Sequence, residues 1–141
     1  MAKNAMVIKE VLEMLKMSPL KLTSQRKKLI KIIFANGDGH YTAEDVFKKA
    51  KQNKVKISLA TVYNTLNSFK KCGILNIVKT SSDKIYFDTN LKEHHHFFCK
   101  ETGELIDIKS SKIFISKLPK TPDGKKVSSV NVIIDIDNNS I

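Results

Sequence analysis

The sequence predicts an α+β fold, with four helices and a two-stranded hairpin in residues 1–88 and a smaller α/β domain in residues 89–141. Three observations support this prediction. Apolar residues recur at helical spacing as far as Lys71, two short strand-like segments follow Gly73, and apolar residues alternate near the C-terminus. A chain of 141 residues can hold one ordinary domain or two small ones.

Two helices are expected before the glycine-rich turn at residues 36–39. The first spans about residues 5–16 and ends at Ser18-Pro19. Thr23 can cap the second helix. The buried face of this second helix consists of Leu29, Ile30, Ile33 and Phe34.

Two further helices precede the hairpin. Thr42, followed by acidic residues, predicts the N-terminus of a third helix that runs through Ala50. Ser58 caps a fourth helix, which extends from Leu59 to about Lys71. The strands Ile74–Lys79 and Lys84–Asp88 then form the hairpin, and this order of elements predicts a winged helix-turn-helix with the fourth helix as its reading helix.

The exposed face of the fourth helix favours nucleic acid as the partner. It presents Thr61, Tyr63 and Asn64, whose hydroxyl and amide groups both donate and accept, as base edges and phosphates require. The distribution of charge also favours a polyanionic partner for the first half. Residues 1–90 hold 17 Lys and Arg against 7 Asp and Glu, whereas residues 91–141 hold 8 against 7. An anionic membrane surface, a protein-interaction module and a lysine-rich compositional bias are the alternatives.

The composition argues against a membrane-spanning protein, a secreted protein and a disulfide-rich protein. No apolar run approaches the ~20 residues that span a bilayer. Glu10 and Glu13 interrupt the N-terminal pattern, so we expect no signal peptide and a cytoplasmic location. DNA is preferred over a membrane as the partner. Cys72 and Cys99 are too few for a disulfide framework or a four-thiolate zinc site, and we expect both to be small buried residues.

Three consecutive histidines form the most distinctive motif, His94-His95-His96, directly before Phe97-Phe98-Cys99. In an extended segment side chains alternate between faces, so His94 and His96 point one way and His95 the other. Two imidazoles on one face can close on one ion, which favours metal or haem binding. A solvated histidine cluster at the start of a strand is the alternative.

Four motifs together resemble the ferric uptake regulator superfamily, which comprises dimeric, metal-responsive winged-helix repressors of bacteria. They are Lys21–Arg26, His40–Phe47, Ser58–Leu66 and the histidine run. The resemblance implies a homodimer on double-stranded operator DNA, with Tyr63 reading bases and with Lys21 and Arg26 against the backbone or minor groove. The expected DNA-binding residues are therefore Lys21, Arg26, Ser58, Thr61, Tyr63 and Asn64. Asn64 departs from the arginine common at its position.

The regulatory site of the family also maps onto this chain. The resemblance implies a regulatory site for Fe(II) or Mn(II), or for Zn(II), made of three imidazoles and two carboxylates. Its residues here are His40, Asp88, His94, His96 and Asp107. The structural zinc of most relatives is not expected, because Cys99 matches its first thiol but Thr102 stands at the second.

The C-terminal half most resembles one branch, the iron response regulator of α-proteobacteria. That branch lacks the zinc cysteines and has a similar proline-containing linker before an alternating strand, here Val127–Ile136, which would form the dimer sheet. Its members sense iron through haem, so haem binding by His94, His95 and His96 is also expected. The resulting hypothesis is an iron- or haem-responsive repressor and not an enzyme.

Two alternatives differ in chemistry. One is a peroxide sensor, in which bound Fe(II) oxidises its own histidines. The other is a metal-dependent hydrolase that uses the histidine and aspartate cluster. Against the hydrolase, the sequence has no nucleophile elbow and no glycine-rich phosphate loop.

Overall fold

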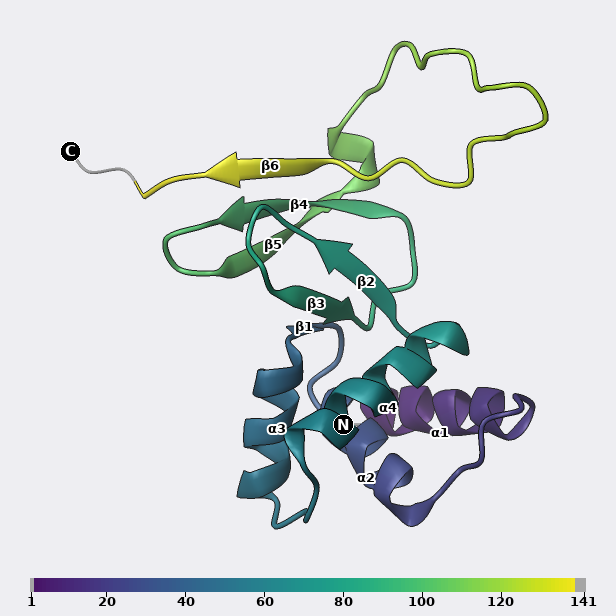
Figure 1. Cartoon of the computed structure of the whole chain (residues 1–141), viewed down its shortest axis with the longest axis vertical. Coiled ribbons are helices and arrows are strands. Elements are labelled where there is room, and N and C mark those ends of the chain that lie inside the picture. Colours follow the sequence, from purple (N-terminus) through teal and green to yellow (C-terminus); the bar gives the residue numbers. More distant parts are fainter. Residues whose placement is uncertain (1, 139–141) are drawn as a thin grey trace. The chain divides into compact units, whose positions relative to one another are not determined.

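The chain, described over residues 2–138 by a computed structural model, divides into two compact units (Figure 1). The first runs through residue 79 and resumes over Asp83–Leu91, and the second takes Thr80–Ser82 and the chain from Lys92 onward. Over residues 2–138 there are four α-helices and two three-stranded sheets, which confirms the α+β class. None of the described helices is long and apolar enough to cross a membrane.

Three of the four helices of the first unit begin where the capping residues predict. The four are α1 (Ala2–Lys16), α2 (Ser24–Ile33), α3 (Ala43–Gln52) and α4 (Leu59–Lys71). The side chains of Thr23, Thr42 and Ser58 each accept a hydrogen bond from the backbone N–H three residues on, so all three caps are confirmed. Only α1 differs, because it begins at Ala2 rather than near residue 5.

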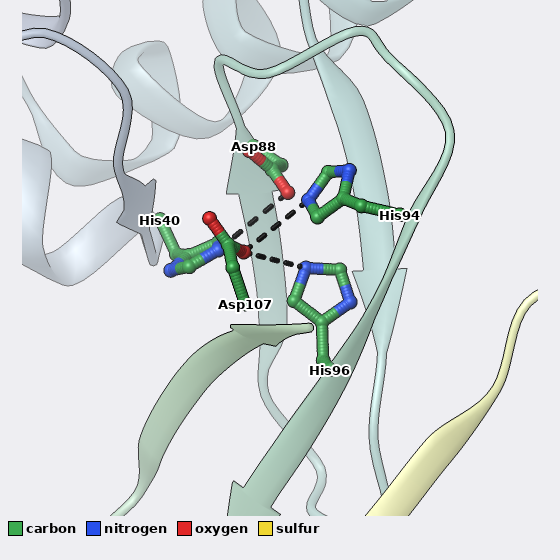
Figure 2. A group of neighbouring side chains, drawn as sticks. All are labelled: His40, Asp88, His94, His96 and Asp107. Atoms are coloured by element: carbon green, nitrogen blue, oxygen red, sulfur yellow. Dashed lines mark ion pairs between the residues drawn. The ribbon is translucent and has the colours of Figure 1, made fainter. Parts of the chain in front are cut away.

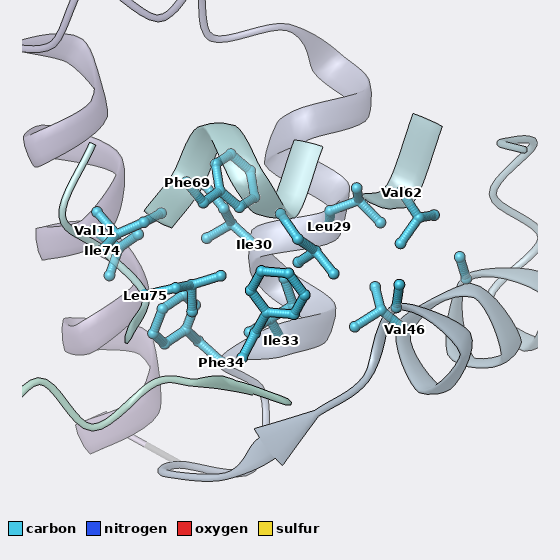
Figure 3. Close-up of a cluster of buried hydrophobic side chains, with 14 of the residues drawn as sticks. Val11, Leu29, Ile30, Ile33, Phe34, Val46, Val62, Phe69, Ile74 and Leu75 are labelled. Carbon is cyan, nitrogen blue, oxygen red and sulfur yellow. The ribbon is translucent and has the colours of Figure 1, made fainter. Parts of the chain in front are cut away.

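The helices pack around one hydrophobic core (Figure 3). Each contributes one buried stripe, as the helical spacing predicts. Ile74 and Leu75, expected to open the hairpin strand, are buried in this core instead. Gly73 turns the chain at a φ of +81°, and the N–H of Ile74 donates back to the carbonyl of Phe69, so these two residues close α4 rather than pair in a sheet.

The hairpin of the first unit carries a third strand that the sequence did not predict. The sheet order is β1 (His40–Tyr41), β3 (Ile85–Asp88) and β2 (Asn76–Lys79), and both pairings are antiparallel. A two-residue strand has too few residues to show an alternating pattern, which explains why β1 was missed. Its effect is to place His40 directly opposite Asp88.

The second unit is a sheet of order β5-β4-β6. Strand β4 (His94–Cys99) pairs antiparallel with β5 (Glu104–Lys109), which a 3₁₀ turn over Ser110–Lys112 follows, and parallel with β6 (Ile133–Ile136). The expected strand Val127–Ile136 was therefore too long. A strand forms only where a neighbour completes its hydrogen bonds, and β4 pairs with this segment only from His96 onward.

Candidate metal centre and nucleic-acid interface

The first group of candidate metal ligands lies in the sheet of the first unit. The pairing of β1 with β3 brings His40 opposite Asp88, with Nε2 of the imidazole 3.6 Å from Oδ2 of the carboxylate. The side chain of Asp88 is buried, and its Oδ1 also accepts a 2.9 Å hydrogen bond from the N–H of Asn90. Burial of a carboxylate is costly unless hydrogen bonds or a cation stabilise it, so this position favours binding of a cation.

The second group lies on one face of the sheet of the second unit. His96 pairs directly with Asp107 across β4 and β5, and His94 lies two residues along on the same face. Oδ1 of Asp107 is 3.3 Å from Nε2 of His94 and 3.2 Å from Nε2 of His96. One ligand atom from each of the three residues lies within 4.8 Å of the others. Figure 2 shows the side chains of both groups.

Hydrogen bonding determines which nitrogen of His94 is available to a metal. Its Nδ1 lies 2.6 Å from the carbonyl oxygen of Lys92. A carbonyl can only accept, so Nδ1 carries a proton, and in the neutral imidazole the lone pair is then on Nε2. Nε2 is also the nitrogen directed at Asp107. A backbone carbonyl that fixes the tautomer of a histidine in this way is one of the usual partners of a metal-binding imidazole.

His95 lies on the opposite face of β4, as the alternation predicts. It is buried, and its Nδ1 accepts a 3.0 Å hydrogen bond from the N–H of Val132, just before β6. The structure therefore groups His94 and His96 with Asp107 and separates His95 from them. The expectation of haem binding, which included all three histidines, stays a prediction.

The expected DNA-contacting residues of α4 are exposed together at its N-terminal end. Ser58 caps the helix, and its Oγ lies 2.8 Å from Oγ1 of Thr61. Tyr63 is 38% exposed, and Asn64 is exposed beside it. These hydroxyl, phenol and amide groups all lie on the surface of one helix, which suits base edges in the major groove.

Lys21 and Arg26 also come together in the first unit. A guanidinium nitrogen of Arg26 donates to the backbone carbonyl of Lys21, so Arg26 holds the turn before α2 while Lys21 stays exposed. Gln25, to which the sequence analysis gave no role, donates a 3.1 Å hydrogen bond to the carbonyl of Lys56. This bond ties the start of α2 to the segment that leads into α4. Its only signal in the sequence is its place in the Lys21–Arg26 motif.

A shallow hollow of about 540 Å³ lies between α4 and β2 in the first unit. The side chains that line it are mainly amides, hydroxyls and ammonium groups, which are donors suited to phosphate oxygens. Its lining residues are Asn64, Asn67, Ser68, Lys70, Lys71 and Ile77. The hollow extends the polar surface of α4 from the expected base-reading residues toward the C-terminus of the helix.

The two cysteines lie in different surroundings, and both are free thiols. Cys99 is buried at the end of β4, as predicted, with its Sγ 3.8 Å from Oδ1 of Asn138. Cys72 is only partly buried at the C-cap of α4. With two cysteines in the chain, four thiolates cannot be assembled from one copy.

A winged helix-turn-helix, a second strand-rich unit and two groups of histidine and aspartate ligands are the features of a metal-responsive DNA-binding regulator. The comparison with protein families agrees, since the model of the ferric uptake regulator family matches residues 17–134. The chain belongs to the ferric uptake regulator family.

Relatives and solved structures support the same assignment. The chain is 31% identical over 100 residues to the peroxide operon regulator of Bacillus subtilis, covering 71% of this chain and 68% of that protein. It is 25% identical to the ferric uptake regulator of Francisella tularensis solved with iron, with a TM-score of 0.69 and coverage of 86% and 94% of the two chains. The fold also matches the ferric uptake regulator of Pseudomonas aeruginosa solved with manganese, at 23% identity, a TM-score of 0.69 and coverage of 89% and 96%.

These matches are to transcription regulators, and none of them supports the hydrolase alternative. They also bear on the branch within the family. The relatives named above are peroxide and ferric uptake regulators, so the expected membership of the iron response regulator branch stays a prediction.

Proposed function

We propose that this protein is a homodimeric, metal-responsive repressor that binds double-stranded operator DNA through α4. Fe(II) or Mn(II), or Zn(II), would be held by His40, Asp88, His94, His96 and Asp107. Such an ion would control the affinity of the winged-helix unit for DNA.

The convergence of two imidazoles on one carboxylate carries this proposal. His94 and His96 direct their Nε2 atoms at the same oxygen of Asp107, and the carbonyl of Lys92 fixes the tautomer of His94. Nitrogen and oxygen donors in this mixture suit Fe(II), Mn(II) and Zn(II) better than the softer copper(I) ion. A metal bound there would supply the positive charge that draws these side chains together.

We further propose that the two ligand groups close on one ion. Residues 89–93 alone separate Asp88 from His94. A segment that short extends to about 20 Å at most, so the chain keeps the two groups near enough for one ion to bind both. An ion bound by ligands of both units would favour one angle between them and thereby one spacing of the two reading helices in a dimer.

The dimer is proposed to form through the sheet face opposite the metal ligands. Phe97 pairs with Ile106 on one side and Ile134 on the other, so three apolar side chains form a row across β5, β4 and β6. Ile106 and Ile134 are both exposed, and Phe114 beyond β5 is 91% exposed. A self-complementary apolar face of this kind suits a second copy of the same chain.

Titration of the purified protein tests the metal response. A duplex enriched by the protein from a random library is the probe, and its binding is followed while Mn(II), anaerobic Fe(II), Zn(II) or haem is added. We expect one divalent metal to change the affinity for this duplex. The His94→Ala and His96→Ala variants should lose that response, because each removes one of the converging nitrogens.

The Asp83→Asn variant is the matched control, since it removes an exposed carboxylate at the hairpin turn, outside the proposed ligand set. It should respond like the wild type. If none of the added metals changes the affinity of the wild-type protein for the duplex, the proposal of metal control is overturned. If only haem changes the affinity, and the Soret band depends on His94 and His96, then haem and not a divalent metal is the regulatory ligand.

Similarity to the peroxide operon regulator supports a second candidate function, peroxide sensing. Bound Fe(II) would supply the reductant that converts peroxide into an oxidant able to attack a neighbouring imidazole. His94 and His96 are the imidazoles that would lie beside such an ion, and their ring centroids are 4.5 Å apart. Mass spectrometry after peroxide treatment of the Fe(II)-loaded protein should find an added oxygen atom in the peptide with these histidines, and none in the Mn(II)-loaded protein.

A further inference from the structure

The side chain of Tyr63 rests against a buried aromatic ring. The Tyr63 and Phe87 rings meet edge to face, with centroids 6.3 Å apart and an interplanar angle of 86°. Tyr63 is 38% exposed, whereas Phe87 is 1% exposed. One side of the Tyr63 ring therefore contacts the core, while the rest of the ring stays available at the surface.

Phe87 is held firmly from both sides. It lies in β3, the middle strand of its sheet, opposite Tyr41 on β1 and Ile77 on β2. It is also a member of the main hydrophobic core. A ring in this position is closely confined by its neighbours, because protein cores leave little free volume.

The next residue along β3 is Asp88, which belongs to the first group of candidate metal ligands. Its carboxylate faces His40, the residue beside Tyr41 on β1. Successive side chains of a strand point to opposite faces, so β3 directs Asp88 toward the proposed metal and Phe87 toward α4. The two roles are separated by a single peptide bond.

We propose that Phe87 is a positioning residue, which fixes the ring of Tyr63 in the orientation that reads bases and ties that orientation to the strand bearing Asp88. This inference rests on the proposed DNA-binding function. An edge-to-face aromatic pair favours one arrangement of the two rings over others. Loss of the Phe87 ring should leave Tyr63 in place but allow it several orientations, only some of which match a base pair.

The expected effect is a loss of discrimination rather than a loss of binding. The strength of an aromatic pair corresponds to about a two- to tenfold change in an equilibrium constant. The Phe87→Leu variant should therefore prefer the selected duplex over a random duplex about two- to tenfold less than the wild type does. Affinity for the random duplex should stay unchanged, because phosphate contacts supply it.

The matched control is Phe69→Leu. Phe69 lies on α4 in the same core and is as fully buried as Phe87, so the same substitution creates a similar cavity without touching the contact with Tyr63. Phe87→Met serves as a second variant, because methionine fills irregular space without a ring. The wild-type protein is first assayed with and without saturating Mn(II). All variants are then compared, as full-length protein, in whichever of these two conditions the wild type binds DNA.

A double-mutant cycle separates positioning from a purely structural role. In a Tyr63→Leu background, Phe87→Leu should cause no further loss of discrimination, because its target ring is absent. Equal discrimination in Phe87→Leu and Phe69→Leu would overturn the inference, as would additive losses in the cycle. If Tyr63→Leu itself retains full discrimination, then the proposed base-reading role of Tyr63 fails instead.

Discussion

Val132 donates its backbone N–H to Nδ1 of His95 at 3.0 Å, and its carbonyl accepts the N–H of His96 at 3.1 Å. Two consecutive residues of β4 thus hold the start of β6. One face of β4 carries candidate metal ligands, and the other face fastens the neighbouring strand through a buried imidazole. His95 therefore has a structural contact that His94 and His96, the two candidate ligands, do not share.

The His95→Ala variant should lose stability but keep its metal site. The substitution removes the Nδ1 acceptor, so the N–H of Val132 loses this hydrogen bond. Such a loss lowers the free energy of unfolding by about 1–3 kcal/mol. Urea unfolding measures this loss, and Mn(II) titration should give the wild-type affinity. The His95→Asn variant is the control, because its amide oxygen can replace Nδ1 as the acceptor and should recover part of the stability. A His95→Ala protein with normal stability but no metal binding would reverse these assignments.

Much of this arrangement follows from the sequence alone, because local sterics determine it. The alternation of side chains on a strand placed His94 and His96 on one face and His95 on the other before any partner strand was known. The caps at Thr23, Thr42 and Ser58 are equally local, since each bonds within its own helical turn.

The features that sequence analysis missed depend on contacts between distant segments. The two residues of β1 become a strand only because β3 pairs with them, whereas Val130 and Val132 continue the alternation of β6 but lie outside the strand. The contact of Asp107 with His94 and His96 depends on the register of β5, which alternation within β4 cannot supply. A resemblance to known proteins was needed to place that aspartate.

Thr42 connects the stability of α3 to the candidate ligand His40. Its side chain accepts the N–H of Asp45 at 3.1 Å, and Oδ2 of Asp45 accepts the N–H of Thr42 at 2.9 Å, which completes a capping box. The Thr42→Ala variant should lose about 0.5–2 kcal/mol of stability. It should also bind Mn(II) more weakly, because the turn that sets β1 and His40 is loosened.

The Thr23→Ala variant provides the comparison for this effect. Thr23 caps α2 with the same kind of side-chain hydrogen bond, from the N–H of Arg26, but its helix carries no candidate metal ligand. It should lose similar stability in urea and keep the wild-type affinity for Mn(II). An equal loss of Mn(II) affinity in both variants would mean that general destabilisation, and not the position of His40, causes the weaker binding.

Tyr63 and Lys21 should affect DNA binding in different ways. The Tyr63→Ala variant should lose about 1–3 kcal/mol of discrimination between the selected and a random duplex, because base contacts carry sequence information. The Lys21→Ala variant should weaken binding to both duplexes alike and lower the salt dependence by about one released ion. Fluorescence anisotropy over a series of salt concentrations measures both. Equal losses on both duplexes for Tyr63→Ala would remove it from the base-reading role.

The apolar row across the second sheet predicts how the dimer responds to substitution. Ile106 is exposed in one copy and pairs with Phe97, so a lysine there is tolerated by the single chain but repels its copy across a two-fold axis. Ile106→Lys should therefore sediment as a monomer at micromolar concentrations, whereas Met14→Lys, an exposed apolar position on α1, should remain dimeric. A chelator should leave the wild-type dimer intact, because two cysteines cannot form a four-thiolate zinc site. A wild-type protein that is monomeric, or a dimer that the chelator dissociates, would contradict this assembly.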